Sequence, residues 1–341
     1  MHTIEKEIFS QSEALIKTLE YMERNAGLVK GMFNGCNKVV FMGCGSSYML
    51  CEGAAALFGA RTKLKSMACA GGEVMLNPGD FKNLFDGALV VVPSRSGETS
   101  EVLRAIAAMR PLSCFKLLSI VAAEDSGLSK ISELTLELPW IFDASVCQTR
   151  TVSNLYLALL YLAAAYDPAA VGDLRGAISG VSEYIETITP ICRSLAARDW
   201  KTVTVLADGE LCGIAREGAL AFGEISTIAG DYFKLLDYRH GPAVLADRCK
   251  LIIAVIRDAN AGYSRDFVRD VRQRGAYVIT IGPAERADCG GDTFIAIPPL
   301  EDYAAWGFYL VAVCQLTAFY KALAVGHDPD QPNGLDPYIK L

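Results

Sequence analysis

Histidine is scarce in this sequence: His2, His240 and His327 are the only three among 341 residues. Cysteine is common, with eleven residues, but the cysteines are scattered and no two of them form a CxxC pair. Neither residue type has the spacing of a structural zinc site. We therefore interpret the cysteines as reduced, mostly buried, small apolar residues, and we expect no bound metal ion.

Positive charge is also in deficit, because 32 Lys and Arg residues face 39 Asp and Glu residues and give a net charge of −7. A nucleic-acid-binding surface normally needs a basic face, so we expect no nucleic-acid partner. We further expect no apolar run of the ~18–20 residues that a membrane span requires. The N-terminal 25 residues are charged and helix-patterned, without the core of a signal peptide. Together these features predict a cytoplasmic protein with no membrane partner.

The composition that remains is that of a folded chain, with 52% hydrophobic and 21% charged residues. In the first half, short and almost continuously apolar runs alternate with helical patterns. The predicted strands are 38–43, 88–93, 115–123 and 134–139, and the helical patterns between them include 48–60 and 100–110. This alternation is typical of βαβ units, whose parallel strands are buried on both faces.

The second half repeats the pattern with similar spacing. Its predicted strands are 200–209, 251–257, 276–283 and 294–299, and its helices include 214–230, 264–275 and a buried-looking segment over 302–324. The fold class expected is therefore α/β, with two similar doubly wound parallel-sheet subdomains of flavodoxin-like type. The expected boundaries are an N-terminal helical segment (1–36), a first subdomain (37–165), a helical linker (166–199), a second subdomain (200–326) and a tail (327–341).

Two loops in the first half combine glycine with hydroxyl side chains: GCGSSY (43–48) and SRSGETS (94–100). Each follows a predicted strand and precedes a helix, where backbone N–H groups stabilise an anion. Either loop alone could be ordinary helix N-capping. Two such loops after neighbouring strands favour a phosphate site. The corresponding loop of the second half (255–264) lacks this arrangement and carries Asp258, so we expect one phosphate site per chain.

In the second half, Glu217 and Glu224 lie seven residues apart on one face of a predicted helix, and His240 follows Glu224 by sixteen residues. A lone histidine is usually structural and a helix glutamate usually solvated. Glu224, however, lies in the otherwise uncharged stretch ALAFGEISTIAG. A carboxylate in apolar surroundings has a raised pKa, which suits a proton-transferring base.

At these residues the sequence resembles a known family. CGSSY, SRSGETSEVL, EGALAFGEIS and YRHGP are similar to four signature stretches of tandem sugar isomerase (SIS) domain proteins. The resemblance covers nearly the whole chain and is closest to the isomerase half of glucosamine-6-phosphate synthase and to the fructosamine- and glucosamine-6-phosphate deglycases. The glutaminase domain of the synthase is absent, so no glutamine hydrolysis is expected.

The resemblance implies a site that binds a sugar 6-phosphate without a cofactor. In this family the phosphate lies on the hydroxyl loop, here Ser94, Arg95, Ser96 and Thr99, with Gly45 and Ser46 nearby. It implies that Glu224 transfers the proton and that His240 opens the sugar ring, reaching the site from a neighbouring subunit, so we expect a homodimer or higher homo-oligomer. Further substrate contacts are expected from Ser47, Gln148, Glu217 and Lys340.

Two departures from the family pattern bear on the reaction. Ala221 stands where aminating and isomerising members have a helix lysine, and Pro337 stands where the synthase has its imine-forming lysine, with Lys340 three residues further on. The loss of these lysines resembles the deglycases, which act on sugars that already carry an amine. We therefore predict amine release from an amino-linked sugar 6-phosphate. The alternatives are an aldose–ketose phosphosugar isomerase and a non-catalytic sugar-phosphate sensor.

Overall fold

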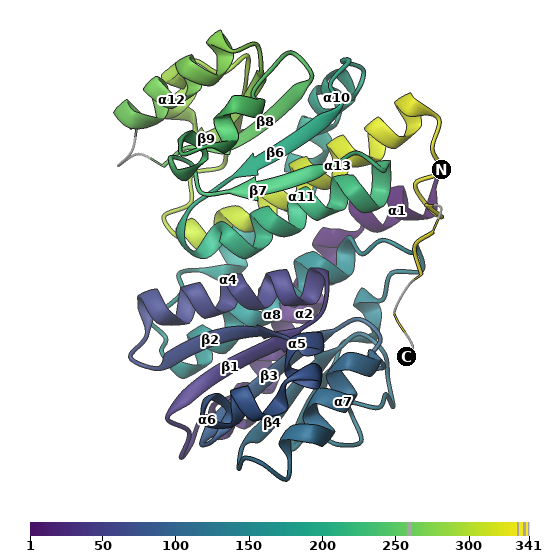
Figure 1. Cartoon of the computed structure of the whole chain (residues 1–341), viewed down its shortest axis with the longest axis vertical. Helices are drawn as coiled ribbons and strands as arrows, with labels where there is room; N and C mark the ends of the chain where they lie inside the picture. Colours follow the sequence, from purple (N-terminus) through teal and green to yellow (C-terminus); the bar gives the residue numbers. More distant parts are fainter. Residues whose placement is uncertain (258–260, 333, 337–338, 340) are drawn as a thin grey trace. The chain divides into compact units, whose positions relative to one another are not determined.

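The computed structural model describes residues 1–341 apart from 258–260, 333, 337–338 and 340, and leaves the side chains of 286–288 undescribed (Figure 1). The chain forms two compact units. The first-sheet unit consists of Ser10–Ser179 and Asp336–Leu341, and the second-sheet unit of Met1–Phe9 and Gly180–Leu335. Each unit contains one five-stranded sheet in which all strand pairs are parallel. The predicted fold class is thereby confirmed.

The sheet of the first-sheet unit has the strand order β2-β1-β3-β4-β5. Its strands are β1 (Lys38–Gly43), β2 (Lys65–Ala70), β3 (Ala88–Ser94), β4 (Lys116–Val121) and β5 (Leu134–Glu137). Its helices are α2 (Gln11–Arg24), α3 (Ala26–Met32), α4 (Ser46–Arg61), α5 (Gly71–Leu76), α6 (Lys82–Phe85), α7 (Ser100–Met109), α8 (Arg150–Tyr166) and α9 (Leu174–Ser179).

Both faces of this sheet are covered, which explains why its central strands are apolar without alternation. On one face, Val90 and Val92 of β3 pack with Val102 and Ile106 of α7. On the other face, the ring of Phe41 in β1 lies 5.3 Å from that of Phe58 in α4. All seven residues of β3 are buried, so the loop that follows β3 starts from a fixed point.

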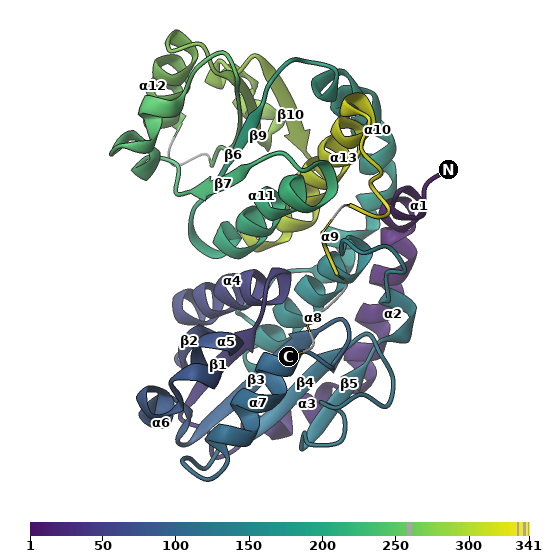
Figure 2. The ribbon, with the colours of Figure 1, turned by 45° about the vertical axis from the view of Figure 1, so that its right-hand side comes forward.

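The second-sheet unit repeats this topology with the order β10-β9-β8-β6-β7. Its strands are β6 (Thr202–Leu206), β7 (Gly230–Phe233), β8 (Lys250–Val255), β9 (Tyr277–Pro283) and β10 (Thr293–Ile297). Its helices are α1 (Thr3–Phe9), α10 (Val181–Ala196), α11 (Cys212–Ser226), α12 (Ala261–Gln273) and α13 (Trp306–Val325). Figure 2 shows α12 on one face of this sheet and α11 and α13 on the other.

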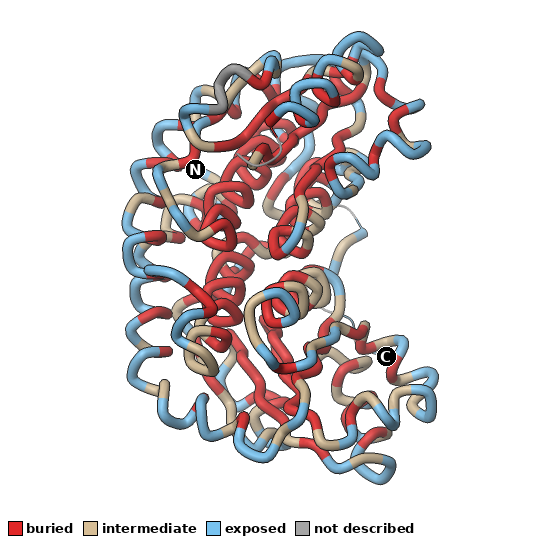
Figure 3. Tube along the Cα trace, turned by 90° about the vertical axis from the view of Figure 1, so that its left-hand side faces the viewer, coloured by how far each residue is buried: buried red, intermediate tan, exposed pale blue. Residues whose placement is uncertain are grey.

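Burial follows the same layers within each unit. In Figure 3 the buried residues concentrate in the strands and in the helices that cover them, while the outer turns are exposed. Six of the eleven cysteines are buried, and only Cys114 is exposed. All eleven are free thiols.

Helix α13 corrects one expectation. Tyr303–Val325 is long and apolar enough to span a membrane by length and composition, so the expectation that no such run exists was wrong. However, 83% of its most apolar window is buried inside the structure. It packs against α10 and α11, and the Tyr309 ring lies edge-on to Tyr184 of α10 at 4.8 Å. The run is apolar because α13 is the central core helix of its unit.

Candidate active site

The first candidate loop connects β1 to α4. Gly43 is required there by close packing, because a Cβ at this position would lie 2.8 Å from the backbone of both Ser47 and Tyr48. Gly45 follows with a positive φ of 55° and leads directly into α4. Ser46 and Ser47, the first two residues of the helix, are buried. The free N–H groups of the first turn of α4 therefore belong to this loop, as the sequence predicted.

Cys44 lies inside this first loop and is not a reactive thiolate. Burial raises the pKa of its thiol, and the nearby Glu101 carboxylate raises it further. The backbone N–H groups of Gly71 and Gly72 act in the opposite direction with smaller effect. Because a thiol must ionise to act as a nucleophile, Cys44 serves here as a packing residue.

The second candidate loop follows β3, and its hydroxyl groups shape the turn. The Ser94 hydroxyl accepts a hydrogen bond from the Gly97 N–H at 3.0 Å, and the Ser96 hydroxyl accepts one from the Glu98 N–H at 3.1 Å. Thr99 precedes α7 as its N-cap residue, and within the described residues its side chain makes no capping hydrogen bond. Ordinary N-capping therefore does not account for the Thr99 hydroxyl.

The strand order brings the two loops together. Strands β1 and β3 are neighbours, and the chain order reverses between them. In a doubly wound sheet this switch point lies at the carboxyl edge, where ligands bind in the crevice between the loops. The first loop and Ser94–Thr99 therefore lie at neighbouring positions on this edge of the sheet, at the N-termini of α4 and α7.

Arg95 faces another part of its unit. Its side chain is buried, and Nη1 donates hydrogen bonds to the backbone oxygens of Ser145 and Val146 at 3.0 and 2.9 Å. These bonds tie the Ser94–Thr99 loop to the segment that leads into α8. The sequence indicated a cationic residue in the loop, but its contacts depend on a segment fifty residues away.

The segment that Arg95 holds also contains Gln148. Asp143 anchors the segment, because its Oδ2 accepts hydrogen bonds from the N–H groups of Thr149 and Thr151 at 2.7 and 2.8 Å. The Oε1 atom of Gln148 is buried and has no hydrogen-bond partner within the described residues. A buried polar atom of this kind requires a partner, which suits a substrate contact. Sequence analysis missed the anchoring role of Asp143.

The tail reaches the start of α7 in the same unit. The N–H of Leu341 donates to the Ser100 hydroxyl at 3.0 Å, and Arg104 Nη2 donates to the Leu341 backbone oxygen at 2.5 Å. The Ser100 N–H donates to the Ile339 oxygen at 3.4 Å. Lys340 and Pro337 lie outside the described residues, so their roles stay predictions.

Replacing Gly97 with alanine should distort the Ser94–Thr99 loop. Gly97 has a φ of 65°, and an added Cβ would lie 2.3 Å from the Ser126 hydroxyl oxygen. Overpacking and a left-handed φ together should lower the free energy of unfolding by about 2–4 kcal/mol, which is measured as a lower thermal unfolding midpoint. Adding Ser126→Gly to Gly97→Ala should recover part of the loss, with Ser126→Gly alone as the control. Strictly additive effects would show that the two residues do not collide.

In the second-sheet unit, Glu217 and Glu224 face different environments along α11. Glu217 is only 1% exposed and lies close enough to Cys314 of α13 to contribute to the raised pKa of that thiol. Glu224, two turns later, is half-buried. Ala221 between them is buried. The partial exposure of Glu224 is what a proton-transferring group needs, whereas Glu217 belongs to the α11–α13 contact.

A strained turn directly follows Glu224. Thr227 has a φ of 54°, which is rare for a β-branched residue. The His327 ring holds this turn, with Nδ1 lying 2.6 Å from Thr227 Oγ1 and 3.0 Å from the backbone oxygen of Ser226. Because a carbonyl oxygen only accepts, Nδ1 must carry the proton. Strain of this kind clusters at functional sites, and the sequence gave no signal for it.

His240 lies in the same unit, at the end of a short 3-10 turn (Asp237–Arg239), and is exposed. Gly241 after it has a φ of 129°, which ordinary residues avoid. Apolar side chains close by in sequence are exposed as well, with Val244 at 76% and Leu245 at 60%. Both side chains lie within five residues of His240 in the sequence.

The switch point of the second sheet differs from that of the first. It lies between β6 and β8, and the loop after β6 carries Asp208, whose Oδ1 accepts the Leu235 N–H at 3.2 Å. Arg257, after β8, stacks over the Tyr303 ring at 3.8 Å. Asp258 lies outside the described residues. Among the described residues of these two loops, no side-chain hydroxyl group takes part in the contacts named here, and the expectation of one phosphate site per chain stays a prediction.

Comparison with known proteins gives one family match in the first-sheet unit and relatives over nearly the whole chain. Residues 32–165 match the SIS domain family. Glutamine–fructose-6-phosphate aminotransferase (isomerizing) from Pyrobaculum aerophilum is 26% identical over 348 residues, covering 98% of this chain and 56% of that protein. The same enzyme from Haemophilus influenzae is 26% identical over 367 residues, covering 98% of this chain and 58% of that protein. The chain thus spans little more than half the length of these relatives.

Solved structures share the fold over nearly the whole chain. Glucosamine-6-phosphate deaminase from Thermotoga maritima has a TM-score of 0.80 at 24% identity, covering 95% of this chain and 100% of its own. Tagatose-6-phosphate ketose/aldose isomerase from Escherichia coli has a TM-score of 0.86 at 20% identity, covering 99% and 95%. The chain thus contains a SIS domain over 32–165, repeats the strand order of that unit in its second unit, and is similar over 98% of its length to the isomerizing aminotransferases.

Proposed function

We propose that this chain is a phosphosugar enzyme that releases an amine from an amino-linked sugar 6-phosphate in the cytoplasm. The observation that carries the proposal is the pair of hydroxyl- and N–H-rich loops, Gly43–Ser47 and Ser94–Thr99, at the switch point between β1 and β3. Such a crevice suits a phosphate, since helix N-termini supply N–H donors and hydroxyl groups add more. Relatives in the SIS family act on sugar 6-phosphates, as the names of the aminotransferase, the deaminase and the isomerase state.

In the proposed reaction, Glu224 removes a proton from the carbon that bears the amine and returns it to the neighbouring carbonyl carbon. This transfer converts the amine into an imine without any external oxidant, because one carbon is oxidised while its neighbour is reduced. Water adds to the imine, the C–N bond breaks, and the free amine and a sugar-phosphate carbonyl remain. General acid–base catalysis of this kind contributes about 10²–10⁴-fold per group. His240 opens the sugar ring or protonates the departing amine.

The phosphate serves as a handle remote from the reacting carbons. Its binding energy can be used to orient the open-chain sugar for the reaction. Arg95 supports the phosphate loop through Ser145 and Val146, and Gln148 is the proposed partner for a sugar hydroxyl. Amine release is preferred over isomerisation because a buried alanine, Ala221, occupies the position of the family's helix lysine.

The decisive assay follows free amine. Incubation of the purified chain with glucosamine 6-phosphate and with fructosamine 6-phosphates should release ammonia or the corresponding amine, detected by mass spectrometry. Fructose 6-phosphate serves as the parallel substrate. Isomerisation of fructose 6-phosphate without any amine release from the aminosugars would replace this proposal with the aldose–ketose isomerase. Binding without turnover of any of these compounds would leave the sugar-phosphate sensor.

The phosphate assignment has a separate test in the double variant Ser96→Ala/Thr99→Val. Loss of two hydroxyl donors should raise the Kd for fructose 6-phosphate at least tenfold, about 1.4 kcal/mol, while the weak affinity for unphosphorylated fructose stays unchanged. Ser113→Ala, at a half-buried serine whose hydroxyl donates to Lys82 O, is the matched control. Equal losses for both sugars would show that the loop does not bind the phosphate.

We further propose a homodimer in which His240 reaches the active site of the neighbouring subunit. His240 is exposed beside Val244 and Leu245, and a second copy of the chain would cover these apolar side chains. Val244→Asp/Leu245→Asp should therefore lower the molar mass measured by light scattering from dimer to monomer and abolish activity together with it. A mass equal to that of the wild type, or an active monomer, would contradict the shared site.

A further inference from the structure

The last turn of helix α11 carries Glu224 and is supported on its core side by aromatic packing. Phe222 in this turn is fully buried, and its ring lies edge-on to the ring of Trp200 at 5.8 Å. Trp200 is fixed as well, because its Nε1 donates a hydrogen bond to the backbone oxygen of Leu195 at 2.9 Å. The core side of the last turn therefore packs on a residue that is itself held in place.

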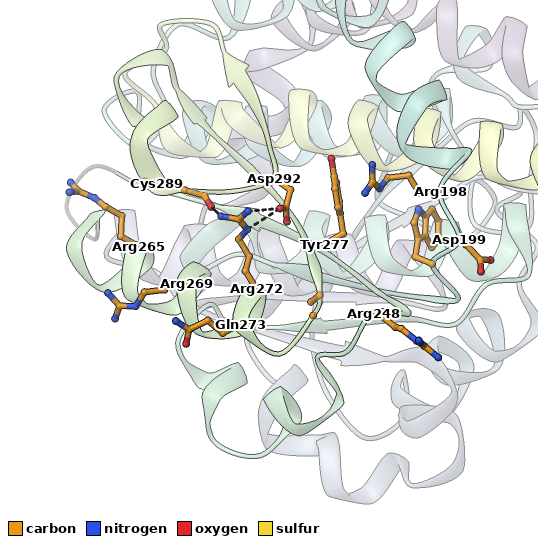
Figure 4. Close-up of a pocket in the computed structure, with 14 residues that line it drawn as sticks. Arg198, Asp199, Arg248, Arg265, Arg269, Arg272, Gln273, Tyr277, Cys289 and Asp292 are labelled. Carbon is orange, nitrogen blue, oxygen red and sulfur yellow. Dashed lines mark hydrogen bonds and ion pairs between the residues drawn. The ribbon is translucent and has the colours of Figure 1, made fainter.

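Trp200 precedes β6 and also lines a cavity of about 860 Å³, which Figure 4 shows. Two arginines of the cavity lining form ion pairs with carboxylates. Arg272 Nη2 lies 2.6 Å from Asp292 Oδ1, and Arg269 Nη2 lies 2.7 Å from Asp266 Oδ1. These pairs stabilise the lining, and Trp200 connects it to the end of α11 through the ring of Phe222.

The end of the same turn is held by hydrogen bonds, one of them from a residue a hundred positions away. The backbone N–H groups of Thr227 and Ile228 close the helix by donating to carbonyl oxygens of its last turn at 3.1 and 3.2 Å. The carbonyl oxygen of Ser226 lies beyond these bonds. His327 Nδ1 donates to it at 3.0 Å. The helix end is therefore completed by a side chain that follows α13.

Thr227 needs this support because its φ of 54° is unfavourable for a β-branched residue. Its Oγ1 donates to the Ser226 oxygen at 2.7 Å and lies 2.6 Å from His327 Nδ1, from which it accepts. One N–H group of the His327 ring thus serves both residues of the turn. The left-handed conformation of Thr227 is stabilised by that ring.

His327 is in turn anchored on both sides along the chain. Its backbone N–H donates to Ala322 O at the end of α13 at 2.9 Å. Three residues after it, Asp330 contacts α1, with its two carboxylate oxygens accepting the N–H groups of Thr3 and Ile4 at 3.0 and 2.8 Å. The ring is therefore presented to α11 from a segment with fixed ends, all within the second-sheet unit.

From these contacts we infer that His327 is a positioning residue for Glu224: by holding Ser226 and Thr227, it keeps the last turn of α11 closed and the carboxylate in place for proton transfer. The inference rests on the proposed function of Glu224. Without the ring, the strained turn loses its support and the helix end frays. Misplacing a reacting group by about 1 Å can lower a rate on the order of 10²-fold. Phosphate binding, which we place on the Ser94–Thr99 loop, does not depend on this turn.

Kinetics of His327→Ala test the positioning role, with whichever of glucosamine 6-phosphate, fructosamine 6-phosphate and fructose 6-phosphate the wild type converts. The turnover number should fall at least tenfold while KM stays within about twofold. His327→Asn is the conservative variant, because its side-chain N–H group can replace Nδ1–H, and it should keep turnover within about threefold of the wild type. Asp328→Asn, at the exposed neighbouring residue, should keep the wild-type rate.

All rates are measured well below the unfolding midpoint of each variant. A lower midpoint for His327→Ala with wild-type turnover would show that His327 only stabilises the fold, and would overturn the inference. A rise in KM alone would overturn it as well. If His327→Ala does not fold, Thr227→Ala and Thr227→Ser give the comparison with His327 intact. Loss of Oγ1 in the first should lower turnover at least threefold, whereas the second should keep the wild-type rate; equal rates would contradict the inference.

A double-mutant cycle tests the route through Thr227. Glycine adopts a φ of 54° without strain, so Thr227→Gly should keep the turn closed without the ring. Adding His327→Ala to Thr227→Gly should then lower turnover by less than about threefold, against at least tenfold in the wild-type background. Equal losses in both backgrounds would show that His327 does not act through Thr227.

Failure of this inference and failure of the proposed function give different results. Wild-type turnover in Glu224→Gln, or no turnover of any of the three sugar phosphates by the wild type, would overturn the proposed function and this inference with it. Loss of turnover in Glu224→Gln together with wild-type turnover in His327→Ala would overturn the positioning role alone.

Discussion

Glu224→Gln is expected to reduce turnover by about 10³-fold while leaving the Kd for the sugar phosphate within about twofold, as loss of a general base predicts. Glutamine keeps the size and the hydrogen-bonding oxygen of the side chain but cannot take up a proton at physiological pH. The carboxylate is half-buried in the last turn of α11, next to the strained Thr227 turn. Its position is therefore set by the helix and does not depend on a mobile loop.

The measurement combines steady-state kinetics with calorimetric binding on the same preparation. Glu186→Gln, an exposed carboxylate on α10 of the same unit, controls for the loss of one negative charge and should keep the wild-type rate. A rate for Glu224→Gln equal to that of the wild type would remove Glu224 from the chemistry and favour the sensor. A large rise in Kd with unchanged maximal turnover would make Glu224 a binding residue.

Gly230→Ala is expected to lower the stability of the second-sheet unit by more than about 4 kcal/mol, the range reserved for severe backbone or core collisions. Gly230 begins β7, and a Cβ there would lie 2.1 Å from the backbone oxygen of Ala219 in α11. A backbone atom cannot turn aside as a side chain can. The strand and the helix that carries Glu224 would have to separate.

Gly223→Ala, in the helix α11 that β7 approaches, is the matched variant and should change the stability in the opposite direction. Gly223 lies in α11, is exposed, and an added Cβ would meet nothing within 4 Å. Alanine in place of a glycine inside a helix should raise the free energy of unfolding by about 0.5–1 kcal/mol. Thermal unfolding followed by circular dichroism checks both variants. An unfolding midpoint for Gly230→Ala at or above that of the wild type would refute the close approach of β7 to α11.

The sequence predicted the six central strands of the two sheets and also the edge strands β5 and β10. The range expected for β1, 38–43, agrees with Lys38–Gly43, because each of its residues from Val39 onward is buried and apolar. Two strands were missed, β2 (KSMACA) and β7 (GDYF). Each is the second strand of its unit in chain order and stands at the edge of its sheet. They are edge strands with partly exposed residues, so neither shows a continuous apolar run. A pattern read from apolar residues detects the centre of a parallel sheet better than its edge.

The candidate site likewise contains positions that the sequence predicted and contacts that it could not predict. The positions of Ser46 and Thr99 at helix starts follow from local sequence, since glycine and hydroxyl residues between a strand and a helix have few other uses. The contacts of Arg95 with Ser145 and Val146, and the support of the Glu224 turn by His327, join residues 50 to 101 positions apart. Local patterns contain no information about such contacts, because they depend on which elements the fold places side by side.

The connection of the two units has a consequence for synthesis of the chain on the ribosome. The chain passes from one unit to the other three times, after Phe9, after Ser179 and after Leu335. Helix α1 therefore leaves the ribosome before the 156 residues of its own unit that follow Ser179 have been made. Until Asp330 has been made, the first turn of α1 lacks the carboxylate whose Oδ1 accepts the Ile4 N–H at 2.8 Å in the folded structure. The first-sheet unit in turn gains its Ser100 and Arg104 contacts only when Leu341 has been added. Neither unit is formed from one continuous stretch of the chain, so no single cut in the gene yields two whole units.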